Sequence, residues 1–324
     1  MAEHTMVAAL NAALGDALDA DARVLVFGED VGRLGGVFRV TDGLQERFGP
    51  ERVFDTPIAE SGFTGMAIGL ALAGWRSVIE MQFDGFSYPA LEQIVSHLAK
   101  YRERTRGRVE LPITVRIPSF GGIRGKEHHG ESPETYYVHT AGLKVVCPST
   151  PLDAYRLLRA AIDDPDPVIV LEPKARYWTK EEGELSADGP GIGAARILRD
   201  GDACTIVAYG SMVARALDAA DALASAGVHA RVLDLRCLSP LDLGLLGTCV
   251  RETGRIVVVH EAPLTLGMGA EIAARAMEAA FDFLEAPVAR VTGWDTPYPP
   301  AALEGVYLPS VERIAEAVRR TVAY

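Results

Sequence analysis

The chain has 324 residues, 48% of them hydrophobic, and a formal net charge of −12 from 44 acidic and 32 basic residues. This length and hydrophobic content suffice for a large core divided between about two domains. An acidic chain without a run of Lys or Arg lacks the positive surface that a phosphate backbone requires, which argues against nucleic acid as a partner.

The first residues and the cysteines indicate the compartment. Residues 1–20 contain no Lys or Arg, and no apolar run approaches the length of a membrane span, so we expect a cytoplasmic protein with no membrane partner. The cysteines are widely separated and lie in or beside apolar segments, which is typical of reduced core thiols rather than of disulfides. They are Cys147, Cys204, Cys237 and Cys249.

The first half of the chain alternates helical and strand patterns. Apolar residues recur every fourth position from Met6 to Leu18, which predicts an amphipathic helix over 5–19 with Thr5 as its cap. Further helices are expected from about 61 to 73, up to about 101, from Ser132, and over 151–162. Strands are predicted at 24–27, 52–55, 77–81, 112–118, 143–147 and 168–171.

The second half repeats this alternation after a break. Residues 173–195 are polar, rich in Gly and Glu and without periodicity, so we place the domain boundary there. The alternation predicts two doubly wound α/β domains, 1–180 and 196–324, joined by a linker at 181–195. The later strands are expected at 204–209, 230–235, 255–260 and 288–292, and the later helices at 211–226, 269–281 and from 310.

Glu60 lies where a predicted strand, ending at Asp55, passes through a turn at Pro57 into a helix. The positive helix end favours its ionised form, and apolar neighbours favour its protonated form. A carboxyl group balanced in this way exchanges a proton near neutral pH. From position alone, however, simple capping of the helix is the better explanation, since Glu is common in a first turn.

Three other segments follow predicted strands, where open α/β sheets bind ligands. Glu29 is either a ligand-facing acid or a solvated turn residue. The aromatic residues from Phe83 to Tyr88 form either core or the walls of a site for a flat heterocycle. The segment 119–134, with four glycines and two adjacent histidines, is typical of an active-site loop. Within it His129 precedes a predicted helix start, which favours a neutral imidazole.

Several motifs, in this order along both predicted domains, resemble one family: the beta chain of the thiamine-diphosphate-dependent decarboxylase component of 2-oxo acid dehydrogenase complexes. The branched-chain type is most similar, from Gln82-Phe83, Tyr88-Pro89-Ala90 and Lys100-Tyr101-Arg102. The motifs are Asp55-Thr56-Pro57-Ile58-Ala59-Glu60, Glu80-Met81-Gln82-Phe83, His129 with Ser132-Pro133-Glu134, Gly142-Leu143-Lys144-Val145-Val146-Cys147-Pro148-Ser149-Thr150-Pro151, and Glu172-Pro173-Lys174.

The resemblance implies a transketolase-like pyrimidine-binding domain followed by a transketolase carboxyl-terminal-type docking domain. It implies that Glu60 hydrogen-bonds the aminopyrimidine ring of thiamine diphosphate and favours its imino tautomer, which activates the thiazolium carbon. Phe86 would stack on the pyrimidine, where the branched-chain family has Tyr. The remaining residues expected to line the cofactor are Glu29, Gln82 and the backbone of Ile58 and Ala59.

The resemblance also assigns His129, and not His128, to proton transfer while the acyl group passes to lipoyl-lysine. Phe83 and Tyr88 are expected to contact the substrate together with His129. The chain departs from the family here, because Gly130-Glu131 stands where Ser-Gln is frequent. The change adds a carboxyl group beside the histidine.

Some family members bind a structural potassium ion, and the matching positions here end in Asp166, where Asn is usual. A cluster of acids at a helix end, without a metal, explains the same residues equally well. The candidate positions are Ile113, Ala161, Ile162, Asp164 and Asp166.

The motif that anchors the diphosphate is missing from the chain. Members that hold it use a Gly-Asp-Gly turn and a downstream Asn to bind magnesium, but this chain has no Gly-Asp-Gly, and its single asparagine is Asn11. We therefore expect a separate alpha chain that brings Mg²⁺, with the cofactor spanning the interface. Two alpha and two beta chains are the family arrangement.

The predicted function is that of the beta subunit in oxidative decarboxylation of branched-chain 2-oxo acids, with acyl transfer to the lipoyl domain of an acyltransferase core. A pyruvate or acetoin dehydrogenase beta subunit is the alternative within the same class. A non-catalytic docking subunit, with Glu60 and His129 purely structural, is the alternative outside it. A transketolase relative acting alone is a third possibility, against which the missing magnesium motif argues.

Overall fold

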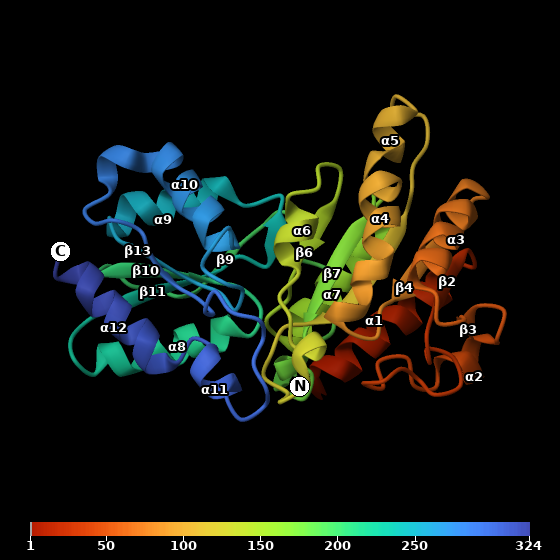
Figure 1. Ribbon diagram of the computed structural model, residues 1–324, viewed down its shortest axis with the longest axis horizontal. Coiled ribbons are helices and arrows are strands. Elements are labelled where there is room, and N and C mark those ends of the chain that lie inside the picture. Colours follow the sequence, from red (N-terminus) through yellow and green to blue (C-terminus); the bar gives the residue numbers. More distant parts are fainter. Residues whose placement is uncertain (1) are drawn as a thin grey trace. The chain divides into compact units, whose positions relative to one another are not determined.

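The computed structural model describes residues 2–324 apart from the side chain of Glu127, and the chain forms two compact units. Unit 1 contains the chain up to Ser119 together with Tyr136–Ile192, and unit 2 contains Phe120–Thr135 together with Gly193–Tyr324. Figure 1 labels their elements. No helix within residues 2–324 combines the length and the hydrophobicity that a membrane crossing requires.

Unit 1 is built on a sheet of parallel strands in the order β6-β7-β5-β4-β2-β3. Most of their residues are buried, as expected for a parallel sheet with both faces covered. The six predicted strands are confirmed, with small shifts at their ends. They are β2 (Val24–Gly28), β3 (Val53–Asp55), β4 (Arg76–Glu80), β5 (Ile113–Ser119), β6 (Lys144–Val146) and β7 (Val168–Pro173).

The helices of unit 1 pack in pairs, α1 with α7 and α3 with α4. The Thr5 hydroxyl accepts a hydrogen bond from the Ala8 amide at 3.2 Å, which confirms the predicted cap of α1. Their bounds are α1 (Met6–Ala20), α2 (Leu44–Phe48), α3 (Glu60–Leu72), α4 (Tyr88–Ser96) and α7 (Pro151–Asp163), with 3₁₀ turns η1 (Asp84–Ser87) and η4 (Lys174–Arg176).

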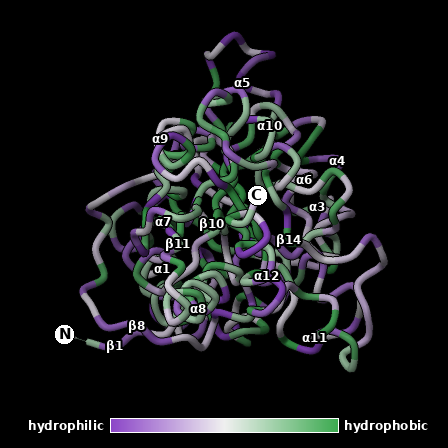
Figure 2. The backbone as a smooth tube through the Cα atoms, turned by 90° about the vertical axis from the view of Figure 1, so that its left-hand side faces the viewer, coloured by the Kyte–Doolittle hydropathy of each residue, from purple (hydrophilic) through white to green (hydrophobic). Residues whose placement is uncertain are grey.

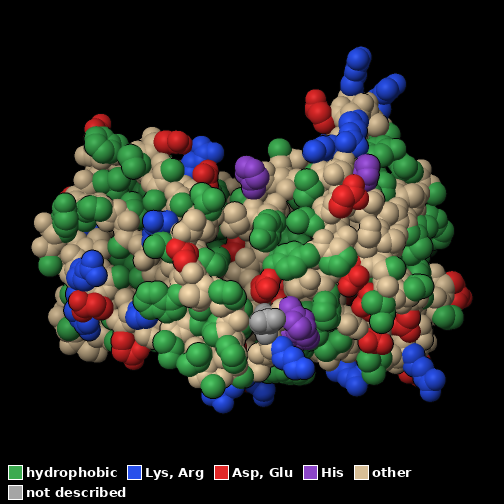
Figure 3. Space-filling view, in the orientation of Figure 1, with side chains coloured by type: hydrophobic (Ala, Val, Ile, Leu, Met, Phe, Trp, Pro, Cys, Tyr) green, Lys and Arg blue, Asp and Glu red, His purple; other side chains and the backbone are tan. Residues whose placement is uncertain are grey.

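The helix expected to continue to about residue 101 is interrupted. At His97 the backbone leaves helical geometry, with φ −121° and ψ −63°. The chain continues through a 3₁₀ turn, η2 (Leu98–Lys100), into the short α5 (Tyr101–Arg104). Lys and Arg side chains gather over α5, as Figure 3 shows.

A small antiparallel sheet pairs the start of the chain with a segment that we expected to be irregular. β1 (Ala2–Thr5) pairs with β8 (Lys180–Gly183), so that Ala2 lies opposite Gly183. Both strands are largely hydrophilic (Figure 2). The expectation of an irregular segment was therefore wrong at these four residues of β8. Neither strand carries an apolar alternation, so no local pattern predicted the pairing.

Unit 2 contains a second sheet in the order β14-β13-β10-β11-β9, in which only β9 is antiparallel to its neighbour. This confirms the mostly parallel sheet, although β9 and α9 were not predicted. Helices α9 and α10 cover one face, and α8 and α12 the other (Figure 1). The bounds are β9 (Arg196–Arg199), β10 (Cys204–Ala208), β11 (Ala230–Asp234), β12 (Cys237–Ser239), β13 (Ile256–Val259), β14 (Ala289–Val291), α8 (Met212–Ala224), α9 (Leu243–Thr253), α10 (Met268–Ala280), η5 (Phe281–Phe283), α11 (Glu304–Tyr307) and α12 (Val311–Val322).

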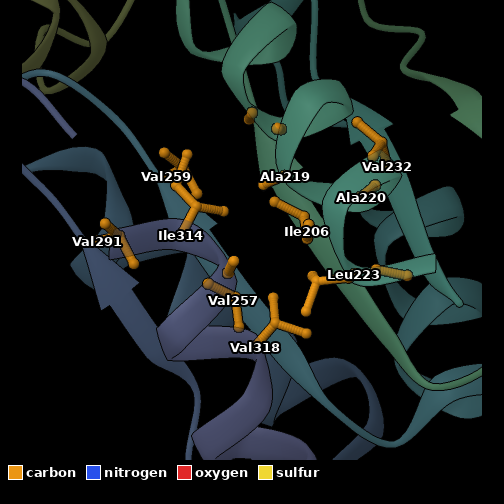
Figure 4. Packing of buried hydrophobic residues seen from close by; sticks show 14 of the residues in the cluster. Ile206, Ala219, Ala220, Leu223, Val232, Val257, Val259, Val291, Ile314 and Val318 are labelled. Carbon is orange, nitrogen blue, oxygen red and sulfur yellow. The ribbon is translucent and has the colours of Figure 1, made fainter. Parts of the chain in front are cut away.

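The core of unit 2 forms where α8 and α12 meet the sheet. Ile206 of β10 and Val257 of β13 lie beside Ile314 and Val318 of α12, and none of the four is exposed (Figure 4). Burying each such side chain contributes about 1.5–3 kcal/mol. The four cysteine side chains are also buried, as expected.

Candidate cofactor site and the His129 loop

The carboxyl ends of β3, β2 and β4 lie side by side in unit 1. Gly28 of β2 is paired both with Asp55 of β3 and with Glu80 of β4. Residues that follow these strands therefore emerge at one edge of the sheet, where open α/β sheets bind ligands. Glu29 follows β2 directly, and Gln82 follows β4 after one residue.

Glu60 reaches the same edge through the turn after β3. Helix α3 begins at Glu60 itself, one residue earlier than the predicted start, and no side chain caps it. The carboxylate is partly exposed, and the neighbouring Ile58 is 86% exposed. The unpaired amides of a first turn and the helix dipole both favour a negative charge at this place.

Glu29 is 7% exposed and has an unusual environment. Burial raises the pKa of its carboxyl group, and the nearby Glu60 carboxylate raises it further, while the Ala59 amide acts in the opposite direction. Its Oε1 atom has no hydrogen-bond partner among the side chains and backbone that the structure describes. A solvated turn residue would not be buried in this way. The oxygen is instead buried and unsatisfied among the described residues, which costs about 1–3 kcal/mol.

The other predicted cofactor and substrate residues lie on the turn that follows β4. Gln82 Nε2 donates a hydrogen bond to Asp30 Oδ2 at 2.7 Å. The Phe86 ring meets the Phe83 ring edge-on, with centroids 5.8 Å apart, and remains partly exposed. The Tyr88 ring lies edge-on to that of Tyr136 at 5.9 Å. The aromatic residues are therefore packed on one another and still present a surface.

Buried charges hold together the strands that carry this edge. Arg116 donates two hydrogen bonds to Glu172, at 2.7 and 2.9 Å, and a third to Glu80. Glu172 also accepts from the Tyr177 hydroxyl at 2.7 Å. Burial raises the pKa of Glu80, and Arg116 opposes that shift. Glu80 and Glu172 belong to the motifs quoted above, and the structure gives them a bracing role that the sequence did not reveal.

A second buried network braces the aromatic turn itself. Lys174 donates to the Asp84 carboxylate and to the Pro118 carbonyl. The Asp84 carbonyl accepts from Ser87 Oγ at 2.6 Å, and that oxygen accepts from the Tyr137 hydroxyl at 2.7 Å. The network fixes η1, which carries Phe86, and only the Glu172-Pro173-Lys174 motif pointed to it in the sequence.

His129 lies in a 3₁₀ turn, η3 (Glu127–His129), within the unit 2 loop. Its amide donates to the Lys126 carbonyl at 2.9 Å, and its ring lies 4.5 Å from that of His128. The His129 side chain is half-buried, whereas His128 is exposed. Helix α6 (Glu134–Val138) begins only five residues later, so the expectation that His129 lies just before a helix start was wrong.

The positions matched to a potassium site already have cationic partners. Arg76 donates to the carbonyls of Ile162 and Asp164. Lys144 Nζ donates to both carboxylate oxygens of Asp164 at 2.7 Å, and Arg102 donates to Asp166. Ile113 and Ala161 are buried side chains. These oxygens are paired with the chain's own cations, so the residues do not fit a potassium cage.

Comparison with known proteins defines the class. Residues 2–179 match the family described as transketolase, pyrimidine-binding domain, and residues 193–314 match transketolase, C-terminal domain. A solved structure described as a split gene transketolase, inactive beta4 tetramer, superposes with a TM-score of 0.78 at 25% identity, over 97% of both chains. The protein therefore has a transketolase-type fold, as the motifs predicted.

Curated relatives narrow this class to one family. The chain is 57% identical to 3-methyl-2-oxobutanoate dehydrogenase subunit beta of Mycobacterium tuberculosis, over 98% of this chain and 92% of the relative. It is 52% identical to pyruvate dehydrogenase E1 component subunit beta of Leifsonia xyli, over 98% and 95%. It is 44% identical to 2-oxoisovalerate dehydrogenase subunit beta of Pseudomonas aeruginosa, over 98% and 95%. The chain belongs to the beta subunits of the thiamine-diphosphate-dependent 2-oxo acid dehydrogenases, which confirms the predicted family.

Proposed function

We propose that the chain acts with an alpha chain in the oxidative decarboxylation of branched-chain 2-oxo acids. In this reaction the carboxyl group leaves as CO₂ and the disulfide of lipoyl-lysine is reduced. One lipoyl sulfur receives the acyl group as a thioester, and the other becomes a thiol. The observation that carries the proposal is the pair of neighbouring acids, Glu29 and Glu60, at the ligand-binding edge of a transketolase-type sheet.

The residues at this edge fit the aminopyrimidine end of thiamine diphosphate. The Glu29 Oε1 atom, which lacks a partner in the part of the chain that the structure describes, suits a donor on the cofactor. Phe86, which is partly exposed, is proposed to stack on the pyrimidine. When bound, thiamine diphosphate supplies the electron sink for decarboxylation. Glu60 holds a proton between its carboxylate and the pyrimidine ring, and the backbone of Ile58 and Ala59, with the Gln82 side chain, orients that ring.

His129 serves the second half of the reaction. An imidazole can give a proton to a lipoyl sulfur or take one from it as the acyl group is transferred. Phe83 and Tyr88 are proposed to contact the side chain of the 2-oxo acid. Their aromatic surfaces suit an apolar, branched substrate.

An alpha chain is proposed to hold Mg²⁺ and the diphosphate, in an assembly of two alpha and two beta chains that serves a lipoyl acyltransferase core. The only asparagine supports this, because Asn11 Nδ2 already donates to the carbonyls of Val40 and Asp42, at 2.8 and 3.0 Å. We retain domain limits of 1–180 and 196–324 as proposals, and a cytoplasmic location as a prediction.

The catalytic assignment is tested with Glu60→Gln in the complex reconstituted with its alpha chain. Loss of the proton held by this carboxylate should lower decarboxylation, followed by reduction of an artificial electron acceptor, by about a hundredfold or more. Glu312→Gln is the matched control, since Glu312 is an exposed first-turn glutamate of α12. An unchanged rate for Glu60→Gln would show that the role of Glu60 is purely structural and would favour the non-catalytic docking role.

Substrate choice is tested on the same complex. We expect a higher kcat/KM for 3-methyl-2-oxobutanoate than for pyruvate, because two of the three relatives named above act on that branched acid by name. A pyruvate dehydrogenase beta subunit is the second candidate, supported by the 52% identity to the Leifsonia chain. Equal or better activity on pyruvate would establish that alternative.

A further inference from the structure

The loop that carries His129 is closed on itself and lies wholly within unit 2. The amide of Phe120 donates to the carbonyl of Glu131 at 2.9 Å, which joins the two ends of the loop. Phe120 has φ 72° and Arg124 has φ 56°, so both non-glycine residues adopt the left-handed conformation. Such conformations turn successive backbone amides toward a common point and are kept only where the surroundings enforce them.

Two separate buried carboxylates of unit 2 accept hydrogen bonds from the loop amides. Glu304 Oε2 accepts from the amides of Gly122 and Arg124, at 3.1 and 3.0 Å. Glu261 Oε2 accepts from the amide of Gly121 at 2.8 Å. Glu304 is 6% exposed and Glu261 is 3% exposed. Hydrogen bonds from amides to buried carboxylates are about twice as strong as neutral ones, so these acids hold one side of the loop in place.

Tyr298 hydrogen-bonds Glu304 and packs against both ends of the loop. Its hydroxyl donates to Glu304 Oε2 at 2.7 Å, and its side chain is 8% exposed. A Cβ atom added at Gly121 would lie 2.1 Å from the Tyr298 hydroxyl, and one added at Gly130 would lie 2.4 Å from its ring. The ring therefore fills the space that glycine leaves at these two positions. Gly130 is one of the residues that depart from the family pattern next to the histidine.

His129 is placed by the same loop. The His129 amide donates to the Lys126 carbonyl, and a Cβ added at Gly125 would lie 3.0 Å from the Cβ of His129. A shift of the loop must therefore carry the imidazole with it. In catalysis a displacement of about 1 Å can cost a hundredfold in rate.

We propose that Glu304, Tyr298 and Glu261 form a clamp that positions His129 for acyl transfer, and that Gly130 is glycine because the Tyr298 ring occupies its side-chain space. The inference rests on the proposed role of His129. The three clamp residues act through the loop, so they are positioning residues. Their loss should affect transfer to lipoyl-lysine and leave decarboxylation nearly unchanged.

The experiment uses the complex reconstituted with its alpha chain and measures two rates separately. Decarboxylation is followed with an artificial electron acceptor, and reductive acylation with a free lipoyl domain. Glu304→Ala and Gly130→Ser should each lower reductive acylation at least tenfold while changing decarboxylation less than twofold. Glu271→Ala is the control, because Glu271 is an exposed acid of α10 paired with Arg275.

Limited trypsin digestion reports the loop directly, since Arg124 and Lys126 are exposed in it. Cleavage after these residues should accelerate about tenfold in the two clamp variants, whereas cleavage after the exposed Arg104 and Arg106 should keep its rate. The double variant Gly130→Ser with Tyr298→Ala should transfer no worse than Tyr298→Ala alone, because the added side chain no longer meets the ring. Should Glu304→Ala fail to assemble, Glu304→Gln keeps the shape and one acceptor and should give a smaller defect of the same kind.

His129→Ala, measured in parallel, separates the two proposals. If it leaves reductive acylation unchanged, the proposed function of His129 is wrong. If it abolishes transfer while both clamp variants transfer at the wild-type rate, this inference alone is wrong. Equal losses in decarboxylation and transfer in the clamp variants would also overturn it, because they indicate general damage to the fold.

Discussion

Two sets of acids in unit 1 differ in what surrounds them. Glu80 and Glu172 share the guanidinium of Arg116, so each carboxylate in the interior has a cationic partner. Glu29, at the edge of the same sheet, lies near the carboxylate of Glu60 and has an oxygen that no described group of the chain satisfies. The first set stabilises the fold. The second costs stability and therefore indicates a ligand.

The largest effect on stability is expected from removing the cation that Glu80 and Glu172 share. Arg116→Met leaves Glu80 and Glu172 buried without their cation, and should lower the free energy of unfolding by about 3–5 kcal/mol. Denaturant unfolding measures this, with Arg275→Met as control, since that exposed ion pair should change stability by less than about 1 kcal/mol. A loss below about 1 kcal/mol for Arg116→Met would contradict the bracing role.

Glu134 in unit 2 is a buried acid whose protonation makes the stability of the fold depend on pH. It is fully buried, its Oε1 accepts from Tyr209 at 2.6 Å, and burial raises its pKa to about 7. The folded state thus binds this proton more tightly than the unfolded state, so the stabilisation is complete below the unfolded pKa of 4.5 and is lost as pH rises through about 7. Glu134→Gln should match the wild type near pH 5 and exceed it by about 1–3 kcal/mol at pH 8.

Because His260 acts in the opposite direction, the difference between variants is the informative quantity. His260 is buried, and burial lowers its pKa to about 4, so it destabilises the fold as pH falls below 6.5. Subtracting the Glu134→Gln profile from that of the wild type removes this contribution. A difference that does not change between pH 5 and pH 8 would show that Glu134 is not protonated in the fold.

A smaller effect is expected from Glu29→Gln, which changes the pair of acids without a cationic partner, Glu29 and Glu60. Removing this charge relieves its repulsion with Glu60, so the melting temperature should stay the same or rise. Decarboxylation by the complex should nevertheless fall about tenfold, since a ligand-facing acceptor is altered. A lower melting temperature together with full activity would place Glu29 with the structural acids.

The smallest effect is expected from potassium. The oxygens of Asp164 are paired with Lys144 and Arg76, so replacing potassium by sodium in the buffer should leave the melting temperature and the rate unchanged. Lys144→Met removes one of these partners and serves as the comparison. A rise in melting temperature with added potassium in the wild type would show that the ion displaces the protein's own cations.

The sheets were predictable because their strands are continuous apolar runs ended by turn residues. Val24–Gly28 and Val168–Pro173 are of this kind. β1 and β8 escaped prediction because they are short and hydrophilic and pair across most of unit 1 in the sequence, as Glu3 with Glu182. Their strand geometry is set by pairing and not by local pattern.

The candidate site divides in the same way. The positions of Glu60 and Glu29 were predictable, because residues that follow neighbouring parallel strands lie at the same edge of the sheet. The clamp was not predictable, because its residues are separated from the loop by more than a hundred residues. Glu304 begins the four-residue α11, and Tyr298 lies outside any helix or strand. Only Gly130, where a side chain is missing beside the histidine, signalled that something packs there.

The central claim is that this chain presents carboxylates to a cofactor whose diphosphate is held by another chain. Calorimetric titration with thiamine diphosphate and Mg²⁺ tests it most directly, comparing the isolated chain, the complex with its alpha chain, and the same complex carrying Glu60→Gln. The account predicts binding by the complex, weaker binding by the variant complex and none by the isolated chain. Binding to the isolated chain as tight as binding to the complex would contradict it.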